Sequence, residues 1–183
     1  MEWYSLKESV GLYGTGIHPL TGEKHELDIE TGGAALFTGH VASPSWKHNR
    51  IDLWSLVWPG VFQTHRLSLE RTPSKQGWMY GFQYYHQTGM GNGGNDDPLK
   101  AYVLPSHKAE VDSGQLGWEH GRGKERSEWT LNGTRIADAS PYVMPREWGR
   151  DPFYTFLSRE RNEGLSNVWA LTAKWDYPHG HQE

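Results

Sequence analysis

The residues best suited to acid–base chemistry lie in and before the segment 77–94, which reads GWMYGFQYYHQTGMGNGG. If this segment begins as a strand, side chains alternate between its two faces, and Tyr84 and His86 share one face. A histidine titrates near neutral pH and can move a proton, and a tyrosine hydroxyl can donate to a developing oxyanion. We therefore predict catalytic roles for His86 and Tyr84, with His65 as a second proton carrier. A histidine hydrogen-bonded for structural reasons is the simpler interpretation of either ring alone.

The same strand face carries three further aromatic side chains, Trp78, Tyr80 and Phe82. Such a row forms either a thick aromatic core or the wall of a ligand pocket, because ligand sites combine aromatic walls with a few polar groups. A second aromatic row is expected in 168–177, and the segment 51–58 is apolar on both faces. We predict a substrate-binding role for six residues: Trp78, Tyr80, Phe82, Trp58, Trp169 and Trp175.

The segment 89–97, GMGNGGNDD, offers oxygen ligands between glycines, as a calcium loop does. It resembles one turn of a glycine-rich calcium repeat, but such repeats work in tandem and this copy is solitary. A hairpin loop or pocket lid is the preferred interpretation. His179 and His181 stand two apart near the end of the chain and are interpreted as part of a frayed tail. We predict neither a metal site nor a cofactor.

Composition limits the class of protein. The 183 residues suit one domain spanning 1–183, and the absence of cysteine excludes disulfides and thiolate chemistry. The net charge is −4 and basic residues are scattered, so no nucleic-acid partner is predicted. The sequence has no run of about 18 apolar residues, so no membrane helix is predicted. The first ten residues lack the pattern of a signal peptide. We expect a cytoplasmic protein.

Ten Trp, nine Tyr, 22 Gly and ten Pro favour short strands and turns over helices. Strand patterns recur along the chain, including 34–41, 51–58, 61–70, 77–87, 99–104, 153–157 and 168–177. The pair Asn132-Gly133 lies between two β-rich runs and predicts a type I′ hairpin turn. These patterns predict an all-β fold: a single antiparallel barrel of lipocalin-like type, or a barrel-like sandwich with little helix.

These observations favour a small-molecule enzyme that works without a cofactor. It would hold an apolar or polycyclic substrate in an aromatic-lined cavity and promote a cyclisation, an isomerisation or a lyase-type step. The alternative is a lectin-like, carbohydrate-binding β-sandwich without catalytic activity, in which exposed Trp and Tyr stack on sugar rings. A third interpretation buries the aromatic residues at a subunit interface, and a homodimer is accordingly considered.

Overall fold

The structure is a computed structural model that describes residues 2–5, 16–17, 24–25, 35–73, 76–98, 100–121, 126–144, 152–156 and 164–177. These residues form strands, turns and loops but no helix, so the prediction of an all-β fold is confirmed. The short strands are β1 (Glu2–Ser5), β2 (Gly16–Ile17) and β3 (Lys24–His25). The long strands are β4 (Ala35–Ala42), β5 (Asn49–Trp58), β6 (Phe62–Arg71), β7 (Gly77–Gly89), β8 (Lys108–His120), β9 (Ser127–Ile136) and β10 (Val168–Asp176).

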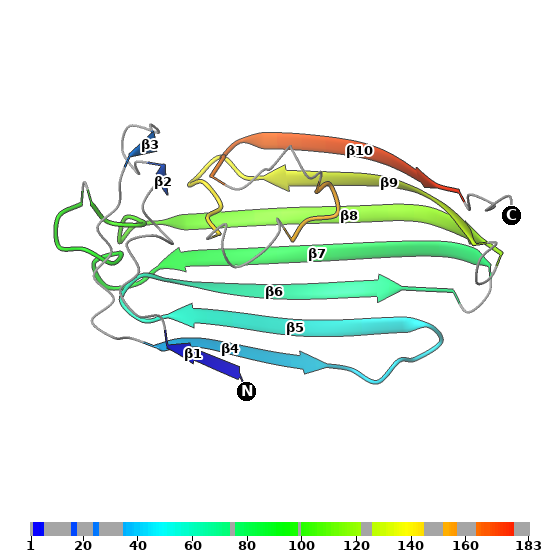
Figure 1. Ribbon diagram of the computed structural model, residues 1–183, viewed down its shortest axis with the longest axis horizontal. Coiled ribbons are helices and arrows are strands. Elements are labelled where there is room, and N and C mark those ends of the chain that lie inside the picture. The colour runs from blue at the N-terminus through cyan, green and yellow to red at the C-terminus, as the bar shows by residue number, and fades with distance from the viewer. Residues whose placement is uncertain are drawn as a thin grey trace, which may run out of the picture.

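One eight-stranded sheet, in the order β1-β4-β5-β6-β7-β8-β9-β10, dominates the fold, and β2 and β3 form a separate pair. All of its neighbouring strands are antiparallel. Figure 1 shows the long strands side by side, with β1 and β10 at opposite edges. In the described part of the chain these edge strands do not pair with each other, so the sheet is open.

The predicted hairpin at Asn132-Gly133 is wrong, because both residues lie in the interior of β9. The side-chain amide of Asn132 donates to the hydroxyls of Thr130 and Thr172, and Gly133 is paired with Gly114 on β8 and with a residue of β10. Pairing with a long strand on each side outweighs the local preference for a turn.

Two other predicted strands are loops where the structure describes them. Residues 100–104 and 152–156 are turns and irregular backbone. Their apolar side chains, including Ala101, Val103 and Phe153, are buried against the sheet. Apolar and polar residues alternate in these segments as they do in strands, because some of the side chains are buried. The backbone nevertheless forms loops that pack over the strands.

The sheet has one face covered by loops. On β7 this covered face carries Met79, Gln83, Tyr85 and Gln87, all buried. The loop between β7 and β8 packs over one part of it, where Val103 joins a cluster with Leu36, Leu56, Trp58, Val61 and Phe62. The segments after β9 pack over another part, where Tyr142 and Phe153 join Tyr85, Ala109, Val111 and Ile136.

Gln87 fixes both loops to the covered face. Its side chain is fully buried, and its Nε2 donates to Thr64 Oγ1 at 2.7 Å and to the carbonyl of Val143 at 2.8 Å. Its Oε1 accepts from the backbone N–H of Val143 at 3.0 Å and lies 3.0 Å from His107 Nε2. Buried polar groups are stable only when they are paired in this way. One amide thus holds strand β6, the loop before β8 and the segment after β9 together.

We expect Gln87→Met to lower the free energy of unfolding by about 2 kcal/mol or more, because it leaves several buried groups without partners. Urea denaturation measures this change. Gln63→Met is the matched control: Gln63 is partly exposed, and its side-chain amide donates to Thr88 Oγ1. A loss at Gln87 no larger than at Gln63 would contradict the role of this amide.

Stability is also expected to depend on pH through His107. Burial lowers the pKa of this imidazole from 6.5 to about 4. Between these values the unfolded chain binds a proton that the native protein does not, so stability falls as the pH drops from 6.5 toward 4. At pH 5 the loss is about 2 kcal/mol. In urea titrations at several pH values, His107→Gln should flatten this slope, and an unchanged slope would refute the assignment.

Candidate functional site

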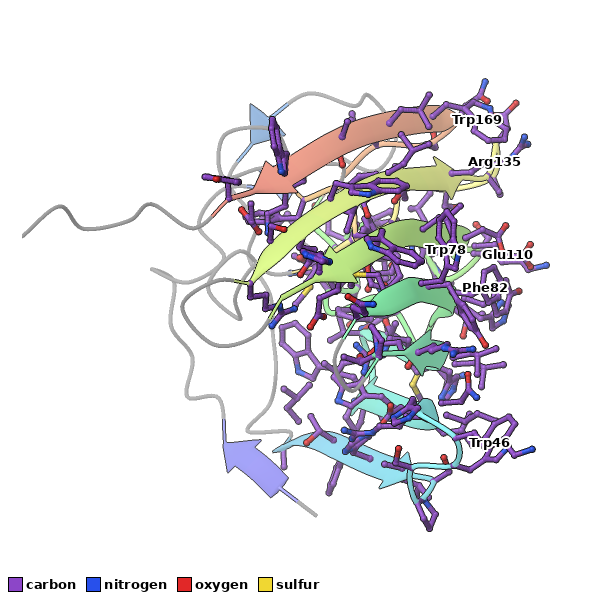
Figure 2. All side chains as sticks on the ribbon, turned by 90° about the vertical axis from the view of Figure 1, so that its right-hand side faces the viewer. Trp46, Trp78, Phe82, Glu110, Arg135 and Trp169 are labelled. Carbon is purple, nitrogen blue, oxygen red and sulfur yellow. The ribbon has the colours of Figure 1, made fainter. Side chains whose placement is uncertain are left out.

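The other face of the sheet, named here the open face, is apolar and largely exposed. On β7 it carries the predicted aromatic row, with Trp78 50% and Phe82 44% exposed. Figure 2 shows Trp78, Phe82, Glu110, Arg135 and Trp169 on the same side of the sheet. By strand register, further exposed apolar residues share this face: Phe37, Val41, Ile51, Leu53, Leu67, Leu116, Trp129, Leu131, Leu171 and Trp175. Exposed apolar surface of this extent marks an interaction or ligand site.

A row of polar side chains crosses one end of the open face. Ser55, His65, His86 and Glu110 are successive cross-strand partners on β5, β6, β7 and β8, and they are named here the histidine row. Ser55 Oγ lies 2.9 Å from His65 Nδ1, and His86 Nδ1 lies 3.7 Å from Glu110 Oε1. Directly opposed residues have Cβ atoms only about 5 Å apart, so the two imidazoles are neighbours. The row therefore combines a hydroxyl, two bases and a carboxylate.

Neighbouring charges and burial set the protonation states of Glu110, in the histidine row, and of Tyr84, two residues from His86. Lys108 Nζ is 3.0 Å from Glu110 Oε1, and this bond lowers the pKa of Glu110, with a smaller effect from His86. Burial, followed by the charges of Glu110 and Asp112, raises the pKa of Tyr84. The carboxylate beside His86 thus stays ionised, and the Tyr84 hydroxyl stays protonated and able to donate.

A row of tryptophans crosses the opposite end of the open face. Trp78, Trp118, Trp129 and Trp175 are successive cross-strand partners on β7, β8, β9 and β10, and they are named here the tryptophan row. The Trp78 ring lies 5.3 Å from the Trp118 ring and 5.9 Å from the Trp129 ring, in both cases edge to face. Such pairs stabilise one another. Along β7 this row is about 26 Å from the histidine row.

Glycines leave bare backbone between the two rows, and a further glycine, Gly39, extends the line of the histidine row onto β4. Gly114 and Gly133 are cross-strand partners in the row of Phe82, and a Cβ at Gly114 would meet nothing closer than 4.0 Å. Beside Ser55, a Cβ at Gly39 would meet nothing within 4 Å. Glycine inside a strand often marks the close approach of a ligand or another backbone. On the covered face, by contrast, a Cβ at Gly81 would collide with the ring of Tyr154.

The structure brings together the three residues predicted for catalysis. His65 and His86 are cross-strand partners, and Tyr84 lies two residues from His86 on the same face. The catalytic roles themselves stay predictions. Two neighbouring residues of the row were not predicted from the sequence, Ser55 and Glu110. Nothing in their local sequence distinguishes them, because only the strand register places them beside the histidines.

Five of the six residues predicted to bind substrate lie on the open face, namely Trp78, Tyr80, Phe82, Trp169 and Trp175. Trp169 stands apart from the tryptophan row, with Arg135 Cζ 4.8 Å from its ring centroid. Trp58 is on the covered face and fully buried beside Phe62, so the structure does not bring it together with the others. Trp118 and Trp129 complete the tryptophan row and were not predicted.

The glycine-rich segment 89–97 lies beside Gly60 and Val103 and contains hydrogen bonds among its own residues. Asn92 Nδ2 donates to Asp96, and Asn95 Oδ1 accepts from the N–H of Asp97. Backbone bonds tie Gly94 to Gly60. Across the described residues, no group of three or more His, Asp or Glu side chains is placed to hold a metal ion.

Searches against protein-family models, curated proteins and solved structures find no match to this chain. Within the described residues, no helix is long and apolar enough to cross a membrane. What the open face does is therefore inferred from its own geometry.

We expect the tryptophan row to contribute to stability as a unit. In a double-mutant cycle, Trp78→Ala and Trp118→Ala should show a coupling of about 1 kcal/mol, because their rings are in contact. The control cycle pairs Trp78→Ala with Trp169→Ala, which lie in different rows and should be additive within about 0.5 kcal/mol. Urea denaturation at fixed protein concentration provides the four free energies of each cycle, and equal coupling in both cycles would contradict the contact.

Proposed function

We propose that the protein is a cofactor-independent enzyme that binds an apolar or polycyclic substrate on the open face and moves a proton at the histidine row. The observation that supports this most is the pairing of His65 with His86 at the end of an extensive apolar surface. A substrate seated over Leu53 and Leu67, in the row of Tyr84, would lie one row from the two imidazoles. The reaction class that fits is a cyclisation, an isomerisation or a lyase-type elimination.

The histidine row and Tyr84 have complementary roles in this proposal. His86, beside the ionised Glu110, takes a proton from substrate carbon, because the carboxylate stabilises the imidazolium that forms. The protonated hydroxyl of Tyr84 donates to the oxygen that becomes negative. His65, the cross-strand partner of His86, takes the proton from the His86 imidazolium and then, as an imidazolium itself, returns it to another substrate carbon, while Ser55 orients the ring through Nδ1. The apolar surface holds the reactive conformer.

Such chemistry benefits from enclosure of the open face. A lipocalin-like barrel would enclose it by pairing β1 with β10, but β1 has four residues and β10 has nine. A second layer packed on the open face would enclose it equally well. Cytoplasmic location and the absence of nucleic-acid and membrane partners belong to the same proposal.

Binding can be measured before the substrate is known. An anilinonaphthalene sulfonate dye, which fluoresces in apolar surroundings, should bind the wild type and lose at least about 10-fold in affinity in Leu67→Lys, because a buried charge disfavours an apolar ligand. Leu165→Lys is the matched control, since Leu165 is 45% exposed but precedes β10 and is not part of the open face. Equal dye affinity in the two variants would argue against a site at Leu67.

Proton transfer can be measured in D2O on a panel of polycyclic and polyunsaturated compounds. Deuterium incorporated at substrate carbon, read by mass spectrometry, should fall about 100-fold or more in His86→Gln and in His65→Gln. His40→Gln is the control, because His40 lies on the covered face in a pair with Asp52. If both row variants label substrate as fast as the wild type, the histidine row is not the proton carrier.

The tryptophan row favours a second candidate, a carbohydrate-binding module. Trp129 and Trp175 are cross-strand partners and are 43% and 74% exposed. Exposed rings in a row can stack on successive sugars. In this case oligosaccharides would bind by calorimetry, Trp175→Ala would weaken binding, and His86→Gln would not. Binding that requires His86 instead favours the enzyme.

A further inference from the structure

Among the residues that the structure describes, the charges of the open face are confined almost entirely to one end. Lys108, Glu110, Asp112 and Arg135 occupy the three rows nearest the histidines. The rows of Phe82, Tyr80 and Trp78 carry one described charged side chain, Arg71 at the end of β6. The rest of this apolar half is aliphatic, aromatic, amide or glycine. Interface centres have the same composition, being rich in aromatic residues and poor in Lys, Glu and Asp.

From these observations we propose that a second copy of this chain packs on the open face, apolar half to apolar half. The sheet needs a second layer, because a sheet is stable in water when its apolar face is buried against another element. Two sheets packed face to face lie about 10 Å apart with their strands nearly aligned. The two copies are related by a twofold axis that crosses the strands, and the charged ends therefore lie at opposite rims.

The size of the face fits such a partner. Strands of about ten residues and seven neighbouring strands give a face of roughly 34 by 29 Å, or about 1000 Å². Contact over the apolar half would bury roughly 500 Å² per copy, or about 1000 Å² in all, which reaches the lower size of a specific interface. A small molecule would leave most of this surface wet.

The charge of the face also selects this partner over an anionic membrane. Its basic side chains, Lys108, Arg135 and Arg71, are nearly balanced by Glu110 and Asp112, and the whole chain carries −4. An anionic lipid surface attracts clusters of basic residues, and the described residues of this face form no such cluster. An apolar half meeting its own copy brings few like charges together, as an isologous interface requires.

The test is the mass in solution. Sedimentation equilibrium of the wild type at tens of micromolar should give about twice the 20.9 kDa of one chain. Leu131→Lys, at the centre of the apolar half, should raise the dimer dissociation constant at least about 30-fold, because a charge there loses its hydration. Leu165→Lys should leave the dimer intact. A monomeric wild type, or equal dissociation in both variants, would overturn the proposal.

A measurement on the unaltered chain covers the case in which Leu131→Lys does not fold. Dilution of the wild type should shift tryptophan emission to the red at the concentration where the mass halves, because Trp129 and Trp175 become hydrated. Emission that does not change while the mass halves would place the interface elsewhere and overturn the proposal. Vesicles of anionic lipid that bind the monomer and leave no dimer would likewise overturn it in favour of a membrane.

The dimer and the enzyme can fail separately. His86→Gln alters the proposed proton carrier and should remain dimeric, since His86 lies outside the apolar half. If the wild type is monomeric yet labels substrate in D2O through His86, the interface is refuted and the enzyme stands. If the wild type is a dimer and labels no substrate, the interface stands and the enzyme is refuted.

Discussion

The alternation of side chains across one antiparallel sheet is the constraint on which the rest of this structure depends. Both hydrophobic clusters of the described residues lie on one face, where Gln87 pairs with groups from both covering loops. Because those loops are committed to this face, they cannot cover the other one. The aromatic residues of β7 therefore point to the open side, and Tyr85 alone among its tyrosines is fully buried. The chemistry of the open face is thus a consequence of where the loops are fixed.

Register then determines which groups meet. His65 and His86 are 21 positions apart in the sequence and become neighbours only because β6 and β7 pair as they do. A slip of one residue would turn either strand's open-face side chains into the core and bring Gln87 out of it. The same register that satisfies Gln87 on one side sets the histidine row on the other. Stability of the core and geometry of the site are therefore coupled through the strand backbone.

Much of the fold could be predicted from local pattern, and much of the site could not. The alternation in 77–87 correctly separates the two faces of β7, and the all-β class follows from composition. Which face of β7 is covered could not be predicted. The buried residue Gln87 is polar and would be expected outside, whereas the exposed residue Trp78 is apolar and would be expected in the core. The turn at Asn132-Gly133 was predicted wrongly for a related reason. Its preference for a turn is local, whereas the strand residues that pair with it are remote in the sequence. Ser55, Glu110 and Trp118 became visible only with the register.

A second layer on the open face would also change the electrostatics of the histidine row. On an exposed surface the interactions of His65 with Ser55 and of His86 with Glu110 are weakened by water and salt. A partner packed on the apolar half would lower the effective dielectric at its border, where the row of Tyr84 lies, and the histidine row is the next row beyond it. A proton carrier gains most at such a border, since it reaches solvent on one side and an apolar substrate on the other. The segregation of charge from aromatic surface serves the interface and the proposed chemistry through the same arrangement of strands.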